Sequence, residues 1–142
     1  HAPDVRATNI DRRCGYIDDQ QLLHEQNACM FHICPSLTEG WGHYIAEALG
    51  VGAVTLTVDA PPMNELVTSE RGILIPYERT HRQRLATTYH FSESGLQTAV
   101  ERAMQMTPEA WSRLSANARR WFQSNRREFH QRVRTAVREL VE

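Results

Sequence analysis

The chain has 142 residues, of which 41% are apolar and 23% are charged, and its net charge at pH 7 is −1. Such a chain is long enough to bury the core of one domain, and its composition excludes a disordered or fibrous protein. No apolar run approaches the roughly 20 residues that a membrane-spanning helix needs. We therefore expect a single domain over residues 1–142.

The small net charge hides an asymmetry along the chain. All 16 basic residues are arginines, and residues 1–78 hold four of them against eleven acidic residues, whereas residues 79–142 hold twelve against six. A basic half of a chain is able to bind nucleic acid, anionic lipid or an acidic partner protein. We interpret most of these arginines as solvent-facing residues of ordinary helices, and we expect no nucleic-acid partner.

The three cysteines and seven histidines show no spacing that is typical of a metal site. An odd number of cysteines also argues against a disulfide framework. Cys29 and Cys34 lie in or next to an apolar run, so we expect both to be small core residues. We expect no protein-bound metal and a reducing cytoplasmic location.

The first half of the chain alternates short apolar runs with helical segments. Several of the runs are rich in β-branched residues, which favour strands, and Leu22 and Leu23 are expected to face inward from the first helix. Such alternation is typical of a parallel α/β sheet. The expected strands are 10–14, 29–34, 51–58 and 73–75, and the expected helices are 19–27, 42–49 and 61–67.

The second half is predicted to be helical. Residues 77–89 are polar and rich in arginine, and we expect a loop or a frayed helix there. A helix is predicted over 92–106, and Thr107 followed by Pro108 is typical of another helix start, with a last helical stretch reaching residue 141. One apolar stripe at helical spacing is expected to join the core: Trp111, Leu114, Ala118, Trp121 and Phe122.

Residues 35–50 combine a strand end, a glycine-rich loop and a helix start. Gly40 and Gly42 let the backbone approach a ligand closely, and free amides at a helix N-terminus attract phosphate. Glu39 lies before the loop, whereas Glu47 lies inside the helix among apolar neighbours, where an unpaired buried carboxylate is costly. Glu47 therefore either caps a loop or pairs with an arginine, or it accepts hydrogen bonds from ligand hydroxyls, which would suit a nucleotide sugar.

The pattern Glu39-x7-Glu47, with Gly-Trp-Gly inside it and Ala-Leu-Gly after it, resembles the signature of the retaining family-4 glycosyltransferases. These enzymes have the GT-B fold, two Rossmann-like domains with the active site between them, and the signature lies in the C-terminal, donor-binding domain. The flanking matches are Gly15-Tyr16-Ile17-Asp18-Asp19, Cys34-Pro35-Ser36 and Pro61-Pro62-Met63-Asn64-Glu65-Leu66-Val67.

The resemblance implies an α/β fold. Its Rossmann-like parallel sheet is partial, the C-terminal half of a GT-B enzyme, and C-terminal helices follow it. Residues 9–78 would form the core of the nucleotide-sugar-binding domain, and residues 79–142 would form the helical C-terminal part. The two βα units that normally open such a domain, with their arginine and lysine for the diphosphate, are missing, as is the N-terminal acceptor domain.

The resemblance also implies a role for each residue of the motif. Glu39, the catalytic candidate, would contact hydroxyls of the donor sugar near the reacting carbon, and Glu47 would bind the ribose. Sugar hydroxyls and the diphosphate would meet the backbone amides of the loop, which are those of Gly40, Trp41, Gly42 and His43.

The base of the nucleotide would lie beside Tyr16 and Ile17 by the same resemblance. Asp19 occupies a place from which an aspartate reads guanine in some GDP-mannose enzymes. The alternative is that Asp18 and Asp19 form a helix N-cap pair, which we favour.

The implied function is the donor-binding portion of an enzyme that transfers a hexosyl group from a GDP- or UDP-linked sugar to an acceptor, as in polysaccharide biosynthesis. Fixed amides and a helix dipole would stabilise the leaving diphosphate without a metal or another cofactor. We expect this portion alone to be inactive. The alternatives are a non-catalytic nucleotide-binding or assembly module, and a different GT-B enzyme such as a nucleotide-sugar epimerase, which the motif fits less well.

Missing βα units would leave the strand at 29–34 with an exposed edge, and exposed edges invite pairing. We therefore expect the strand at 10–14 to pair with it, or the missing domain, a second chain or a second copy to cover it. Association of the parent enzyme with a membrane surface is a further expectation.

Overall fold

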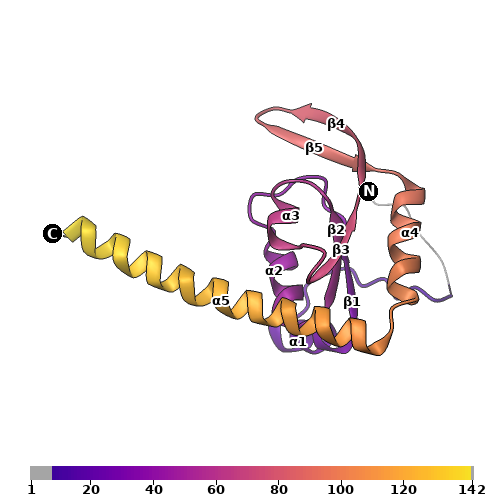
Figure 1. Cartoon of the computed structure of the whole chain (residues 1–142), viewed down its shortest axis with the longest axis horizontal. Coiled ribbons are helices and arrows are strands. Elements are labelled where there is room, and N and C mark those ends of the chain that lie inside the picture. The colour runs from indigo at the N-terminus through magenta and orange to yellow at the C-terminus, as the bar shows by residue number, and fades with distance from the viewer. Residues whose placement is uncertain (1–7, 142) are drawn as a thin grey trace.

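The computed structural model describes residues 8–141 (Figure 1). It contains helices and strands in an order that starts with the alternation expected from the sequence. In chain order they are α1 (Asp19–Ala28), β1 (Phe31–Cys34), α2 (His43–Gly50), β2 (Val54–Val58), α3 (Met63–Leu66), β3 (Gly72–Ile75), β4 (Tyr77–Gln83), β5 (Ala86–Phe91), α4 (Glu93–Met104) and α5 (Pro108–Val141).

Three parallel strands form the central sheet in the order β1-β2-β3. Phe31 pairs with Val54, and Thr55 pairs with Gly72, so each strand begins at the same edge. Helices α2 and α3 lie on one side of the sheet and α4 lies on the other (Figure 1). This is a Rossmann-like α/β arrangement followed by C-terminal helices, and it confirms the expected fold class.

Strand β2 is the centre of the core, and all five of its residues are buried. Val58 joins a cluster with residues of α2 and α3, whereas Val54 and Leu56 join a second cluster with residues of β3, α4 and α5. A strand with covered faces reads as a continuous apolar or β-branched run, as this one does. Burial of each valine and leucine side chain of β2 contributes about 1.5–3 kcal/mol.

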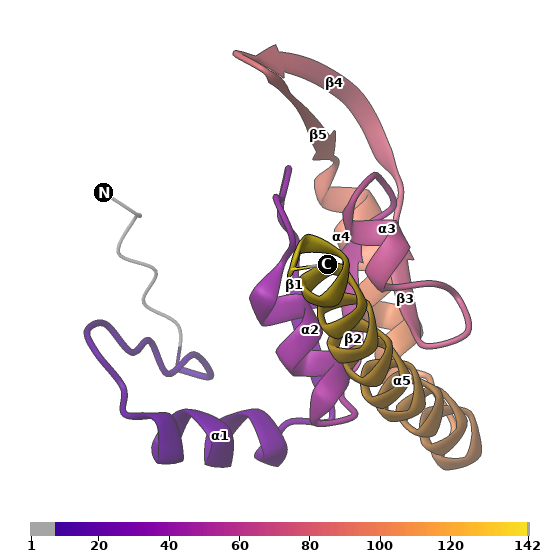
Figure 2. The same cartoon turned by 90° about the vertical axis from the view of Figure 1, so that its left-hand side faces the viewer.

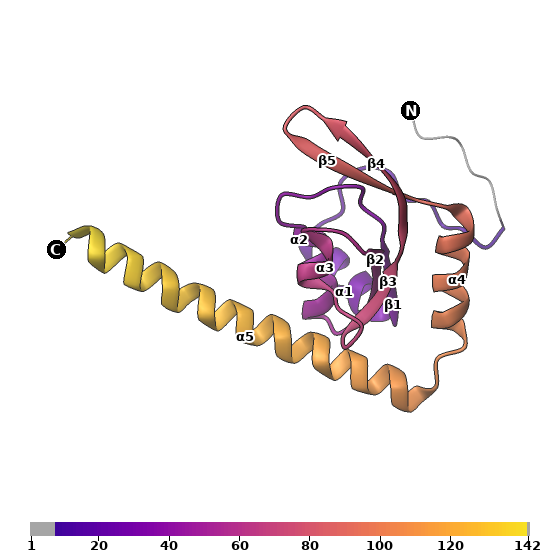
Figure 3. The same cartoon turned by 45° about the horizontal axis from the view of Figure 1, so that its top comes forward.

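Helix α5 crosses the edge at which the parallel strands begin. Its side chains donate to backbone carbonyls there: Trp111 Nε1 to Met30 O over 3.1 Å, Asn117 Nδ2 to Glu70 O over 2.6 Å, and Arg119 Nη2 to Val51 O over 2.7 Å. The expected stripe from Trp111 to Phe122 does pack against the core. Instead of two helical stretches, however, one continuous helix of 34 residues runs to Val141, and its last part extends away from the body (Figures 1 and 3).

The prediction of a loop or frayed helix at residues 77–89 is wrong. These residues form most of an antiparallel hairpin, β4–β5, whose turn includes Arg84 at a positive φ of 56°. Threonine and tyrosine favour strands, and the hairpin contains four such residues, which are Thr80, Thr87, Thr88 and Tyr89. The hairpin rises above the carboxyl end of the parallel sheet and leans toward the side of α2 and α3 (Figures 1 and 3).

Three expectations for the first part of the chain are also wrong. Residues 10–14 form no strand, so they do not pair with β1, and within the described residues β1 pairs only with β2. Leu22 and Leu23 are 39% and 55% exposed because α1 is set apart from the sheet (Figure 2). Cys29 is exposed in the connection between α1 and β1, whereas Cys34 is buried as expected.

Two further properties hold for the part of the chain that the structure describes. None of its helices combines the length and apolar character needed to cross a bilayer. No three of its histidine, cysteine, aspartate and glutamate side chains gather as a metal site would require.

Candidate functional site

Glu39 lies at the carboxyl end of β1, in the loop that leads to α2. Its Oε1 accepts a hydrogen bond of 2.6 Å from the Ser36 hydroxyl, and its side chain is half-buried. Open α/β sheets bind ligands outside the carboxyl ends of their strands. The sequence therefore places a carboxylate with a fixed orientation where such a ligand would lie.

The glycines of the loop differ in what surrounds them. Gly42 has a φ of 81°, and a Cβ there would lie 3.2 Å from side-chain atoms of Ile45 and Leu66, so this position needs glycine. A Cβ on Gly40 would meet nothing within 4 Å, so the backbone at Gly40 is open to a neighbour.

The N-terminus of α2 is not capped by a side chain. Gly42 O accepts from the amides of Ile45 and Ala46, which starts the helix. The preceding amides in the first turn have no partner within the helix, as at any helix N-terminus. This end of α2 therefore attracts an anion.

A pocket of about 500 Å³ lies between α2 and α5. Three of the residues predicted to form the site line it, and the rest of its wall is mainly apolar. The lining residues are Trp41, His43, Ala46, Glu47, Phe122, Asn125, Arg126 and Phe129.

Glu47 is exposed, so the prediction that it is buried is wrong. An eight-residue helix turns Ile45, Ala48 and Leu49 toward the core, and Glu47 projects elsewhere. Its Oε2 accepts a hydrogen bond of 3.0 Å from Gln26 Nε2 of α1. The carboxylate therefore incurs no burial penalty and is held by an uncharged amide rather than by an arginine.

The predicted base-binding residues lie at the start of α1 and do not line this pocket. Tyr16 is 90% exposed, Ile17 is half-buried and Asp19 is exposed. Asp18 is the N-cap of α1, and its Oδ1 accepts from the amides of Gln20 and Gln21 at 3.0 Å each. The N-cap interpretation is thus confirmed for Asp18.

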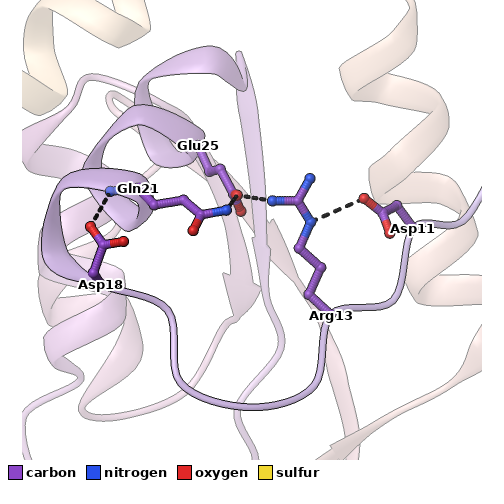
Figure 4. A network of polar contacts seen from close by, with 5 residues as sticks. All are labelled: Asp11, Arg13, Asp18, Gln21 and Glu25. Carbon is purple, nitrogen blue, oxygen red and sulfur yellow. Dashed lines mark hydrogen bonds and ion pairs between the residues drawn. The ribbon is translucent and has the colours of Figure 1, made fainter.

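Figure 4 shows how the segment before α1 is held against the helix. Arg13 Nε donates to Asp11 Oδ2 over 3.0 Å, and Arg13 also pairs with Glu25, which accepts from Gln21. At its other end, α1 contacts β1 and α2 through Gln26, whose carbonyl oxygen lies 3.0 Å from His32 Nε2 and whose side chain donates to Glu47. Helix α1 thus connects the predicted base-binding segment to Glu47.

Two side chains next to Glu39 have raised pKa values. Burial, with a smaller contribution from the negative charge of Glu39, raises the pKa of Cys34 to about 12. Burial also raises the pKa of Tyr44, opposed by a hydrogen bond to Ser36 and reinforced by the charges of Cys34 and Glu39. The thiol and the phenol are therefore both protonated at neutral pH.

No protein-family model matches the chain, and no curated protein matches its sequence. Among solved structures, the chain is similar to a chain in the crystal structure of the GtfA/B complex, with a TM-score of 0.53 and 17% sequence identity. A likeness at this level of identity shows a shared fold. The aligned part covers 77% of this chain and 20% of the other, so this chain spans about a fifth of that protein chain.

Sequence reasoning missed the residues that α5 contributes to the pocket. Asn125 and Arg126 lie three and four residues after Phe122, and Phe129 lies four and three residues after them, so all four share a face of one helix. The predicted core stripe ended at Phe122, and its extension by two turns along α5 would have found them. No pattern in the sequence indicated that Gln26 would contact Glu47.

Proposed function

We propose that this chain is the nucleotide-sugar-binding portion of a retaining glycosyltransferase, as the resemblance of its Glu39-x7-Glu47 motif implies. One observation carries the proposal: Trp41, His43 and Glu47 of the motif line a single pocket beside the uncapped N-terminus of α2. The carboxylate of Glu47 would accept hydrogen bonds from sugar hydroxyls, and the N-terminus of α2 would bind a phosphate. A glycosyltransferase-like fold supports the same conclusion.

The ribose of the donor would bind at Glu47. Gln26 holds Oε2 of this carboxylate, which fixes its orientation without neutralising its charge. The two oxygens of a carboxylate can accept hydrogen bonds from both ribose hydroxyls without another acceptor group. The base would extend toward Tyr16, Ile17 and Asp19, and we propose a GDP- or UDP-linked sugar as the donor.

The diphosphate would bind at the first turn of α2, next to the backbone of Gly40 and Gly42. Negative charge grows on the leaving diphosphate as the glycosidic bond breaks, and fixed amides aimed at it stabilise that charge. Glu39, held by Ser36, would orient the sugar near its reacting carbon. No metal is required for this step.

The acceptor side and the completed catalytic site would come from the rest of the protein. Exposed apolar residues mark two surfaces that it would cover: Met30 and Ile33 by the edge of β1 that no other described strand pairs with, and Val133 and Val137 on α5. The same exposed residues favour the second candidate, a non-catalytic assembly module with this fold. Nucleotide binding distinguishes the two.

The test is a calorimetric titration of the chain with GDP, UDP and ADP. We expect one of them to bind, and we expect Glu47→Gln to weaken that binding about tenfold because hydrogen bonds from ribose to a charged acceptor are lost. Glu101→Gln is the matched control, since Glu101 is also an exposed helical glutamate that accepts from a glutamine amide, that of Gln97.

Two outcomes would contradict the proposal. One is that no nucleotide binds at millimolar concentration. The other is that Glu47→Gln and Glu101→Gln bind the nucleotide as tightly as the unchanged chain does, which would locate the nucleotide away from the pocket.

A further inference from the structure

Helix α5 carries a line of arginines along one face. Four of them recur at every seventh residue and a fifth follows one turn later, so the arginine line consists of Arg113, Arg120, Arg127, Arg134 and Arg138. Seven residues make almost two turns of an α-helix, with a drift of only about 20°. The first four charges therefore follow one another about 10 Å apart, and all five residues are exposed.

The arginine line contains charges of one sign only. Between its first and last members, the positions on the same face are occupied by Ala116, Ser124 and Gln131. Glu128 lies beside the line, but its carboxylate pairs with Arg132 at 3.6 Å. None of the five arginines forms an ion pair with another described residue. A solvent-facing helix surface commonly mixes both signs, so this row of positive charges is available to a ligand.

The arginine line points away from the body of the molecule. Phe122 comes two residues after Arg120, and Phe129 comes two residues after Arg127, which places each phenylalanine about 200° further round the helix. Both phenylalanines line the pocket against α2, and Phe122 packs against the core. The other helices and strands accordingly lie on one side of α5 (Figure 3). A long ligand can therefore reach the whole line from the opposite side.

Three kinds of partner fit this face poorly. Double-stranded DNA carries one charge for about every 1.7 Å of its axis, and its backbone winds round that axis, so a straight row of arginines meets it at few points. A helix that lies on a membrane brings its basic and apolar residues to the same boundary, whereas the apolar face of α5 is opposite the line. A partner helix would need an apolar seam, and the residues between the arginines provide none.

We propose that the arginine line binds an acidic polysaccharide that lies along α5. A linear polysaccharide with one carboxylate on every second sugar presents its charges at a similar interval. A guanidinium binds a carboxylate through two parallel hydrogen bonds. The choice of a polysaccharide rests on the proposed function, which this inference deepens by naming the class of acceptor or product. Because α5 crosses the edge of the sheet opposite the Glu39 loop, the line holds the polymer away from the donor site.

The test is a calorimetric titration of the full chain with hyaluronate oligosaccharides, which carry one carboxylate on every second sugar, at low salt. We expect binding that weakens as salt rises. Arg127→Gln combined with Arg134→Gln should raise the Kd about tenfold, because two exposed charge pairs are lost. Arg126→Gln combined with Arg132→Gln is the matched control: it removes two charges from the same part of α5 but off the line, and it should change the Kd less than twofold.

Several results would overturn this inference. One is equal weakening by the two double changes, which would replace a directed contact by a general charge effect. Another is that duplex DNA, or vesicles of phosphatidylglycerol, bind more tightly than hyaluronate through the same arginines.

The nucleotide titration keeps the two proposals separate. If a nucleotide binds and hyaluronate does not, the polysaccharide surface is overturned and the donor site stands. If hyaluronate binds through the arginine line and no nucleotide binds, the donor site fails and the polysaccharide surface stands.

Discussion

Cys34 occupies the last position of β1, where the sheet, α2 and the Glu39 loop meet. Burial raises the pKa of its thiol from 9.0 to about 12, so the folded chain keeps the proton at pH values where the unfolded chain loses it. Between these two pH values the unfolded state binds fewer protons, and the free energy of unfolding therefore falls as pH rises. Below pH 9 the group contributes no pH dependence.

We expect this fall to be about 1 kcal/mol for each pH unit above 9. The part of the fall that is due to Cys34 should be absent in Cys34→Ala, in which the raised pKa of Tyr44 still lowers the free energy of unfolding above pH 10. Cys29→Ala, a change at an exposed cysteine, should behave like the unchanged chain. Urea unfolding at pH 7.5, 9 and 10.5 measures it. If the free energy of unfolding changed with pH in the same way in Cys34→Ala and in the unchanged chain, the thiol would have the same pKa in the folded and unfolded states, which would contradict this prediction.

At the residue scale, the sequence identified the motif but not the surroundings of each member. Gly42 was recognisable because only glycine readily adopts its φ of 81°. Glu47 was misjudged because a run of apolar neighbours was taken to enclose every direction around a short helix. In three dimensions those neighbours face β2 and α5, and the direction of Glu47 is left open for Gln26.

Helix α5 divides into two parts with different environments. Its first part packs on the core through Leu114 and Ala118, whereas Val133 and Val137 of its last part are exposed. We expect Leu114→Ala to lower the free energy of unfolding by about 2–5 kcal/mol, as for a core leucine. Val137→Ala should change it by less than about 0.5 kcal/mol.

Urea unfolding at two protein concentrations tests this division of α5. A large effect of Val137→Ala, or an unfolding midpoint that rises with concentration, would mean that the last part of α5 is covered by another copy of the chain. Either result would favour the assembly module over the donor-binding portion of a larger enzyme.

At the element scale, helices and buried strands were predictable and the hairpin was not. Strand β2 is a run of β-branched and apolar residues, and Thr107 with Pro108 marks the start of α5. The β4–β5 hairpin gives no such signal, because β4 is exposed on both faces and so lacks an apolar alternation. Its turn places Arg84 at positive φ, where a glycine or asparagine would have marked it.

At the scale of the whole molecule, the chain brings three structures to the carboxyl edge of one parallel sheet. They are the loop with Glu39, the start of α2 and the base of the basic hairpin. The pocket that Glu47 lines lies along α2, between that helix and α5. The opposite edge is closed by α5. The sheet was predictable because short apolar runs alternate with helical segments along the sequence. Contacts between distant segments, such as that of Gln26 with Glu47, depend on the packing of helices and leave no local pattern in the sequence.

The central claim is that a nucleoside diphosphate binds at the start of α2. Amide-resolved NMR of the 15N-labelled chain during titration with GDP, UDP and ADP tests it most directly, because it locates the bound nucleotide. We expect saturable shifts that include the backbone amides of Gly40, Trp41, Gly42 and His43 and the side-chain amide of Gln26, while those of α4 stay unchanged. Shifts centred on α4, or none at millimolar nucleotide, would contradict the account.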